Sequence, residues 1–147
     1  MGLTPDQAAA LVQAAADVRT RAHAPYSGFT VGAAVLSADG RVFTGANVEI
    51  SSYSHTCCAE RVAVFTAVSA GATALIGCAV VTDTQPPAPP CGACRQVLSD
   101  FSHDMELLLA NLHGQVDPVR LADLLPRAFG PAEVLRKIRA RHGHDEG

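Results

Sequence analysis

The sequence predicts an α/β fold with three layers, α/β/α, in which helices cover both faces of a mixed five-stranded sheet. Segments in which apolar residues recur at helical spacing alternate along the chain with β-rich segments, which is typical of such a fold. The 147 residues also match the commonest size of one domain, and a chain of this length can bury a substantial core. We therefore expect a single domain over residues 1–147.

Five elements are expected in the first half of the chain. They are a helix from residue 5 to about residue 22, strands at residues 31–36 and 41–44, a helix at 58–70 and a strand at 75–81. Thr4 can cap the first helix through its hydroxyl, and Pro5 suits the first helical position. Ala38-Asp39-Gly40 is typical of a hairpin turn, and Gly71 ends the second helix. The fifth element is a continuous apolar run, which indicates a strand buried on both faces.

Five further elements follow a stiff, proline-rich loop at residues 86–90. They are a helix at residues 92–101, strands at 106–110 and 115–119, and short helices at 121–125 and 131–141. Residues 111–114 form the turn that joins the last two strands. The remaining residues, 142–147, are polar, and we expect them to be frayed.

Charge and composition exclude several classes of protein. With a formal net charge of −3, the chain lacks the basic face that binding to nucleic acid or to an anionic membrane requires. No apolar run approaches the ~20 residues of a membrane-spanning helix, and the first ten residues do not resemble a secretory signal. We therefore expect a cytoplasmic protein, whose five cysteines are reduced and are buried, bind metal or act as nucleophiles. Charged residues make up only 17% of the chain, which favours contacts between subunits.

Two short segments concentrate the chemically reactive residues: Cys58-Ala59-Glu60 and Pro90-Cys91-Gly92-Ala93-Cys94. Each lies where a predicted helix begins, and the free N–H groups and the dipole of a helix start favour a thiolate. Cys91 and Cys94 are three residues apart and can point to one centre, to which Cys58 adds a third thiolate. Three ligands and an open fourth position describe a catalytic Zn²⁺ site, with iron as the alternative metal. Glu60 is close enough to face the open position without being a ligand.

The pattern Cys-x-Glu followed by Pro-Cys-x-x-Cys is the known signature of zinc deaminases that act on nucleobases. The wider sequence resembles one branch of that superfamily, the small homotetrameric cytidine deaminases. The matching blocks lie at residues 25–34, 45–49, 56–61, 90–96 and 124–131, in the same order as in the family. The resemblance implies one cytidine deaminase-like domain with the three-layer fold described above and one Zn²⁺ per chain.

The resemblance also implies roles for the residues around the metal. Cys58, Cys91 and Cys94 would hold the zinc ion, and Glu60 would move protons between water and substrate. Arg61, one turn after Cys58, would donate hydrogen bonds to the thiolates of Cys91 and Cys94. Its positive charge would offset the net negative charge of a zinc ion with three thiolates, which restores the acidity that the zinc-bound water needs.

Other residues are implied to bind a nucleoside substrate. Asn47 and Glu49 would hold the ribose, and Phe29 would line the pocket. The backbone N–H of Ala59 would donate a hydrogen bond to the O2 carbonyl of the base.

The implied reaction is the hydrolytic deamination of cytidine and 2′-deoxycytidine to uridine and 2′-deoxyuridine, with release of ammonia, in pyrimidine salvage. No organic cofactor is required. Tyr53 and Phe129 would each reach the active site of a neighbouring subunit, so that a homotetramer shares its active sites. The expected partners are therefore a small nucleoside and further copies of the chain, without nucleic acid or membrane.

Several residues also have a simpler interpretation. Cys57 and Cys78 lie outside the motifs and are expected to be small buried apolar residues. His55 could substitute as a metal ligand, but a solvated surface position is favoured. Phe129 could belong to the core of its own chain.

Other functions remain as alternatives. A deaminase of modified cytosine nucleosides, such as the antibiotic blasticidin S, shares both zinc motifs. Against it, the resemblance of Asn47, Glu49 and Phe129, together with Arg61, favours the nucleoside enzyme. A non-catalytic zinc-stabilised binding protein would need a fourth ligand and would not need Glu60. Editing of nucleic acid fits poorly, because the chain lacks a basic channel. Ile50 and residues 54–57 depart from the usual family sequence, which leaves substrate range and details of the tetramer open.

Overall fold

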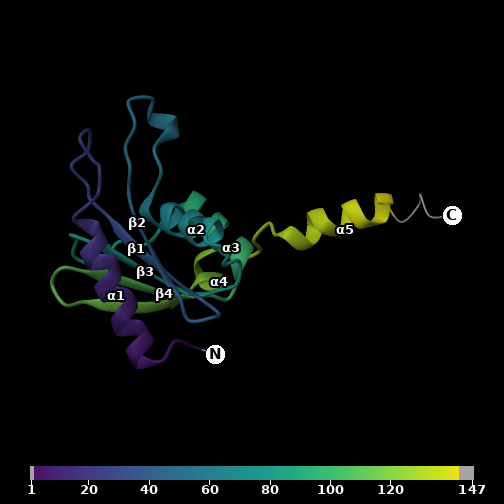
Figure 1. The fold of residues 1–147 in the computed structure, drawn as a ribbon, viewed down its shortest axis with the longest axis horizontal. Helices are drawn as coiled ribbons and strands as arrows, with labels where there is room; N and C mark the ends of the chain where they lie inside the picture. The colour runs from purple at the N-terminus through teal and green to yellow at the C-terminus, as the bar shows by residue number, and fades with distance from the viewer. Residues whose placement is uncertain (1, 143–147) are drawn as a thin grey trace.

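The computed structural model describes residues 2–142, whose strands form one five-stranded sheet in the order β2-β1-β3-β4-β5 (Figure 1). The strands are β1 (Gly32–Ser37), β2 (Val42–Ala46), β3 (Leu75–Thr82), β4 (Glu106–Asn111) and β5 (Val116–Arg120). The helices are α1 (Pro5–Arg19), the 3₁₀ helix η1 (Tyr53–His55), α2 (Ala59–Ser69), α3 (Gly92–Phe101), α4 (Leu121–Leu124) and α5 (Pro131–His142). Only β3 and β4 are parallel neighbours within this sheet, so the predicted mixed sheet is confirmed.

Helices cover both faces of the sheet, which confirms the predicted three layers. Because side chains alternate along a strand, Ala34 and Leu36 of β1 pack in the core under α1. Ala33 and Val35 point the other way, into the core under α2 and α3. β3 is buried along almost its whole length, as its continuous apolar sequence predicts.

Two glycines allow helices to lie directly on the sheet. A Cβ atom at Gly45 of β2 would lie 2.4 Å from the backbone N of Ala63 in α2. A Cβ atom at Gly32 of β1 would lie 1.9 Å from the carbonyl O of Ala15 in α1. Both contacts are to backbone atoms, so a larger residue would push the helix away from the sheet. The close approach at Gly45 fixes α2, and with it the helix start that carries Cys58.

The elements agree with the predicted ranges to within a few residues, with several differences. Residues 53–55 form the unpredicted helix η1, whose N-cap residue Ser52 bonds through its hydroxyl to the ring of His55 and makes no capping hydrogen bond to the backbone. α1 ends at Arg19 and α4 ends at Leu124, both earlier than predicted. His142 is the last residue of α5 rather than part of a frayed tail, and residues 143–147 lie outside the described residues.

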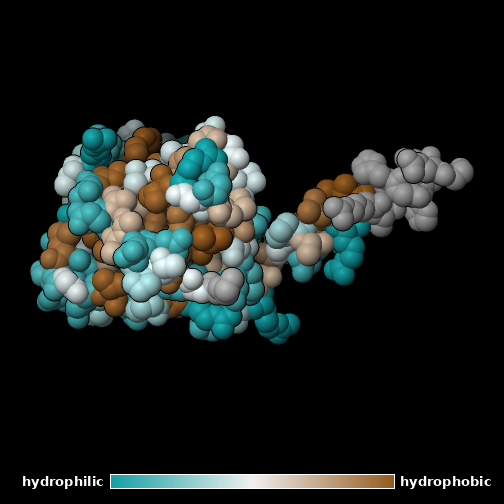
Figure 2. All heavy atoms as spheres, turned by 60° about the horizontal axis from the view of Figure 1, so that its bottom comes forward, coloured by the Kyte–Doolittle hydropathy of each residue, from teal (hydrophilic) through white to brown (hydrophobic). Residues whose placement is uncertain are grey.

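Helix α5 extends away from the sheet and from the helices that cover it (Figure 1). Figure 2 shows hydrophobic atoms along one side of this projecting helix and hydrophilic atoms along the opposite side. Val134, Leu135 and Ile138 are spaced to share one helix face, and all three are exposed. Within residues 2–142, no helix combines the length and the apolar character that crossing a membrane demands.

Candidate active site

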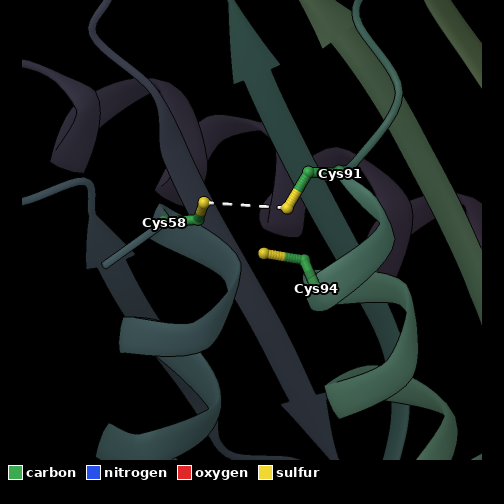
Figure 3. A group of neighbouring side chains, drawn as sticks. All are labelled: Cys58, Cys91 and Cys94. Atoms are coloured by element: carbon green, nitrogen blue, oxygen red, sulfur yellow. Dashed lines mark hydrogen bonds between the residues drawn. The ribbon is translucent and has the colours of Figure 1, made fainter. Parts of the chain in front are cut away.

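Three cysteines from two helix starts lie together in the structure (Figure 3). Cys58 is the N-cap of α2, Cys91 is the N-cap of α3, and Cys94 lies in the first turn of α3. Their sulfur atoms point toward one another, and all three lie within 4.8 Å of each other (Figure 3). The structure thus brings together the three residues that the sequence predicted as metal ligands.

The spacing and chemistry of these sulfur atoms fit a zinc ion. The Sγ atoms of Cys58 and Cys91 are 3.8 Å apart. With Zn–S bonds of about 2.3 Å, two ligands of a tetrahedral site should lie about 3.8 Å apart. None of the three cysteines is in a disulfide, so each thiol is available as a ligand. Three ligands leave one tetrahedral position for water or substrate, as in catalytic zinc sites.

The surroundings of Cys58 favour its thiolate form. A hydrogen bond from the Cys94 thiol lowers the pKa of Cys58 to about 5, and hydrogen bonds from Arg61 and Cys91 act in the same direction. The pKa of Cys94 is raised in turn, because its thiol is hydrogen-bonded to Cys58 and is buried. A zinc ion binds thiolates, so it must displace the proton that this pair shares.

Arg61 contacts the cluster through a different sulfur from the predicted ones. Its Nη2 donates to the Sγ of Cys58 at 3.5 Å and to the carbonyl O of Thr56 at 3.3 Å, whereas hydrogen bonds to Cys91 and Cys94 were predicted. The reason is local, because Arg61 lies three residues after Cys58 and therefore on the same side of α2. The Nε of Arg61 is buried without a hydrogen-bond partner in the described part of the chain. The negative charge of the cluster stabilises this incompletely bonded guanidinium.

We expect Arg61→Gln to bind zinc about 10–100-fold more weakly than the wild type, because a cation beside the thiolates is lost. A competition titration with a coloured chelator measures the affinity. Arg120→Gln is the matched control, since Arg120 is exposed and paired with Asp104, and its affinity should stay unchanged. Equal affinities for Arg61→Gln and the wild type would show that the guanidinium does not act on the cluster.

Glu60 is the buried carboxyl of the site. It is the second residue of α2 and only 5% exposed, and it lines the same pocket as Cys58 and Cys91. Burial raises the pKa of Glu60, and a hydrogen bond with Cys94 offsets part of this effect. A carboxyl with a raised pKa can both accept and return a proton near neutral pH. Its position beside a metal site therefore suits general acid–base chemistry on a bound molecule.

The cluster borders a pocket of about 260 Å³, a size for one small molecule. The sheet register explains its walls, because Gly32 of β1 lies opposite both Ala46 of β2 and Val81 of β3. The residues next to these positions therefore lie together where β1 begins and where β2 and β3 end, and they line the pocket. They are Val31, Asn47 and Thr82.

Asn47 and Glu49 line the pocket. Both side chains also form hydrogen bonds with the backbone of residues 27–31. The Oδ1 of Asn47 accepts the N–H of Val31 at 2.8 Å, and its Nδ2 donates to the carbonyl O of Phe29 at 2.8 Å. Glu49 accepts hydrogen bonds from the hydroxyl and the N–H of Ser27, and these lower its pKa. Glu49 is therefore an ionised carboxylate, and both side chains keep further lone pairs or N–H groups for a ligand.

The other predicted substrate contacts fall into two groups. Phe29 and Ala59 line the pocket of their own chain. Tyr53 does not line it: its side chain is 71% exposed and packs edge-on against Tyr26, with ring centroids 5.5 Å apart. Phe129 does not line it either and is 64% exposed, so it does not belong to the core of its own chain.

Cys57 is more exposed than the sequence predicts. It was expected to be buried, but it is half-buried and lines the pocket. Paired hydrogen bonds of 3.0 and 2.9 Å between the backbones of Cys57 and Val48 fix this position, and they also join the Asn47–Glu49 segment to the start of α2. Cys78 is buried and His55 is exposed, as predicted.

Thr82 lines the pocket without belonging to any motif. It is the last residue of β3 and is buried. A polar residue that ends a buried apolar strand is the signal that could have identified it, because side chains at strand ends border the sites of α/β proteins.

Comparisons with known proteins agree with this geometry. A family model of the cytidine and deoxycytidylate deaminase zinc-binding region matches residues 5–108. A cytidine deaminase of Halalkalibacterium halodurans is 48% identical over 120 residues, which are 81% of this chain and 91% of that protein. A cytidine deaminase of Mycobacterium tuberculosis is 47% identical over 118 residues, which are 80% of this chain and 86% of that protein.

Solved structures support the same assignment. The crystal structure of cytidine deaminase from Burkholderia pseudomallei matches with a TM-score of 0.80 at 45% identity, and the match covers 86% of this chain and 100% of that one. The crystal structure of cytidine deaminase from Mycobacterium tuberculosis matches with a TM-score of 0.72 at 44% identity, covering 83% and 96% of the two chains. The three-cysteine cluster, the matched region and the shared fold together show that this chain belongs to the cytidine and deoxycytidylate deaminase family.

Proposed function

We propose that the protein catalyses the hydrolytic deamination of cytidine and 2′-deoxycytidine to uridine and 2′-deoxyuridine, with release of ammonia, in pyrimidine salvage. The observation that carries this proposal is the buried carboxyl of Glu60 beside three sulfur ligands at the wall of a pocket for one small molecule. Relatives with 46–48% identity are named cytidine deaminases, which supports the same substrate class. A cytoplasmic location is part of the proposal, because a reducing compartment keeps the cysteines free.

The metal centre would consist of one zinc ion per chain, held by Cys58, Cys91 and Cys94. When bound, zinc is a Lewis acid that lets a water molecule ionise near neutral pH. Cys58 and Cys91 are the N-cap residues of α2 and α3, and the positive end of each helix dipole stabilises a thiolate there. Arg61 adds a positive charge at Cys58, which limits the net negative charge of the centre.

Glu60 would move the protons of the reaction. Its carboxylate accepts a proton from the attacking water and gives it to N3 of the base while the C4–O bond forms. It then takes the proton of the new hydroxyl and gives it to the exocyclic nitrogen, so that the C4–N bond breaks and ammonia leaves. The balance is cytidine plus water to uridine plus ammonia. The raised pKa of Glu60 favours the two proton returns.

The substrate would be oriented by several of the groups that line the pocket. Ala59 is the first residue of α2, so its N–H has no partner within the helix and can donate to the O2 carbonyl. Asn47 and the ionised Glu49 can bind the ribose hydroxyls with their remaining hydrogen-bonding capacity. Phe29 supplies an apolar wall for the base.

We further infer a homotetramer with shared active sites, in which Tyr53 and Phe129 contact the pocket of a neighbouring subunit. Both aromatic side chains are largely exposed and lie outside the pocket of their own chain. The exposed apolar face of α5 supports contacts between chains as well. A helix of 12 residues that stands alone is marginally stable in water, and packing against another subunit would stabilise it.

A direct assay tests the proposed function. Purified protein should consume cytidine and 2′-deoxycytidine, seen as a loss of absorbance at the cytosine band, and should contain about one zinc ion per chain. Blasticidin S and a single-stranded oligonucleotide, tested in parallel, should react far more slowly. Turnover of blasticidin S alone would instead support the deaminase of modified nucleosides. Stoichiometric zinc without turnover of any substrate would support a zinc-stabilised binding protein, against which the three-ligand cluster argues.

Mixing two defective variants tests the shared site. Glu60→Ala and Phe129→Ala chains, dissociated and reassembled together, should form intact pockets, because each variant supplies the residue that the other lacks. Random mixing should restore roughly a quarter of the pockets, measured as activity at low cytidine concentration above the sum of the separate variants.

Glu60→Ala mixed with Glu49→Ala is the matched control, because Glu49 and Glu60 line the pocket of the same chain and no mixed pocket can have both. This control mixture should show no gain. If Phe129→Ala also gives no gain while mass measurements confirm subunit exchange, Phe129 does not act across subunits.

A further inference from the structure

Two residues of α3 hold the segment that leads to Phe129. Arg95 and Gln96 directly follow the second zinc motif in the sequence. The Nη1 of Arg95 donates to the carbonyl O of Leu124 at 2.9 Å, and the Nε2 of Gln96 donates to the carbonyl O of Phe129 at 2.8 Å. These two hydrogen bonds attach both ends of residues 124–129 to α3.

The attached segment has few other features that would fix its path. The six residues between α4 and α5 form no helix or strand. Arg127, in the middle, has a φ of 55°, in the left-handed region that residues other than glycine enter at a steric cost. The Phe129 side chain is exposed, so packing within its own chain does not fix its position. The hydrogen bond from Gln96 to its carbonyl therefore fixes where the backbone of Phe129 lies relative to α3.

Arg95 connects the same segment to the metal cluster. Its Nε donates to the carbonyl O of Pro90 at 2.8 Å, and Pro90 immediately precedes Cys91. The guanidinium of Arg95 thus bonds both to the loop that precedes Cys91 and to the end of α4 at Leu124. Gln96 uses both hydrogens of its amide, since its Nε2 also lies 3.2 Å from the Oδ1 of Asp100. The bond to Asp100 is the longer of the two, and the amide can donate to the Phe129 carbonyl without it.

We propose that Gln96 is a positioning residue for substrate binding, which sets where the ring of Phe129 stands relative to α3. The inference rests on the proposed function, in which this ring enters the pocket of a neighbouring subunit. Each subunit's zinc-binding helix thereby shapes the substrate pocket of the next subunit. Gln96 touches neither substrate nor metal and acts through the backbone of Phe129.

Gln96→Glu tests the proposal, because it keeps the length of the side chain and removes the N–H donor. Stacking of an aromatic ring on a base contributes ~1–3 kcal/mol, which corresponds to about 5–150-fold in binding. A misplaced ring should lose part of this contribution to substrate binding. We therefore expect the KM for cytidine to rise about fivefold or more. The kcat should stay within about twofold and the zinc content should not change, since Glu60 and the cysteines are untouched. Gln96→Ala removes the same donor without adding a charge and should give the same result.

Two further variants separate the inference from the function on which it rests. Asp100→Ala keeps the donor of Gln96 and should leave the KM within about twofold of the wild type. Phe129→Ala should raise the KM at least as much as Gln96→Glu, and the double variant should be no worse than Phe129→Ala alone. If Phe129→Ala leaves the KM unchanged, the proposed role of Phe129 fails. If Phe129→Ala raises the KM and both Gln96 variants do not, or if the effects add, the positioning role of Gln96 is wrong.

A spectroscopic measurement gives a readout that does not depend on turnover. The chain contains no tryptophan, so Phe129→Trp introduces a single reporter at the ring position. Adding Gln96→Glu should lower the fluorescence anisotropy of this tryptophan, because its backbone loses the hydrogen bond that holds it. Adding Asp100→Ala should have a smaller effect. Unchanged anisotropy after Gln96→Glu would show that the amide does not hold the segment.

Discussion

Glu60→Gln should lower the kcat for cytidine by about 10²–10⁴-fold or more, while about one zinc ion per chain is retained. The amide has the shape of the carboxyl, but it cannot accept a proton from water or return one to the base. Zinc should stay bound, because the metal is held by the three cysteines and the side chain of Glu60 is not among them. Steady-state kinetics and metal analysis of the same sample measure the two quantities.

The stability of this variant is a second part of the expectation. Glu60 is buried and its pKa is raised, so its charged form is unfavourable in the folded protein. A neutral amide of the same size should leave the melting temperature unchanged or slightly higher. Asp17→Asn is the control: Asp17 is exposed on α1, on the opposite face of the sheet, and activity should be unaffected. Activity of Glu60→Gln within a few-fold of the wild type would exclude the proton-transfer role.

Much of this site could be predicted because its signals are local. The starts of α2 and α3 are set by residues within one turn of Cys58 and Cys91, so the sequence places both thiols at helix N-termini. The spacing of Cys91 and Cys94 puts both on the first turn of one helix. The hairpin of β1 and β2 also follows from a turn of three adjacent residues, and the buried β3 from a continuous apolar run. In each case the deciding contacts join residues close in the chain.

The parts that could not be predicted depend on contacts between distant segments. Whether Arg61 could also reach the cysteines of α3 depends on how α2 packs beside α3, and the structure leaves the guanidinium on Cys58 of its own helix. Cys57 is half-buried because of a backbone pairing with Val48, which no local pattern specifies. The hydrogen bond between Gln96 and Phe129 joins residues 33 positions apart. Such contacts arise only once the sheet has fixed the helices.

Cys94→Ala should abolish measurable deamination and reduce zinc to well below one ion per chain. Cys94 is fully buried and supplies one of the three sulfur ligands in the cluster. Its loss leaves two thiols, and a water molecule in place of the third ligand would bind zinc much more weakly than a thiolate does. Because zinc binds the folded state, its loss should also lower the melting temperature. A chelator should lower the melting temperature of the wild type but have little effect on Cys94→Ala. Metal analysis and thermal unfolding, each with and without chelator, measure these effects.

Cys78→Ala is the matched control for this last variant, because Cys78 is an equally buried thiol outside the cluster. It removes one sulfur atom from the core of β3, so we expect a modest loss of stability, about 1 kcal/mol. Its zinc content, activity and response to chelator should match the wild type. If Cys94→Ala kept one zinc ion per chain, Cys94 would not be a ligand. If Cys78→Ala lost zinc to the same extent, the loss would reflect damage to the core rather than removal of a ligand. The contrast between these two buried thiols therefore decides whether the cluster is the metal site.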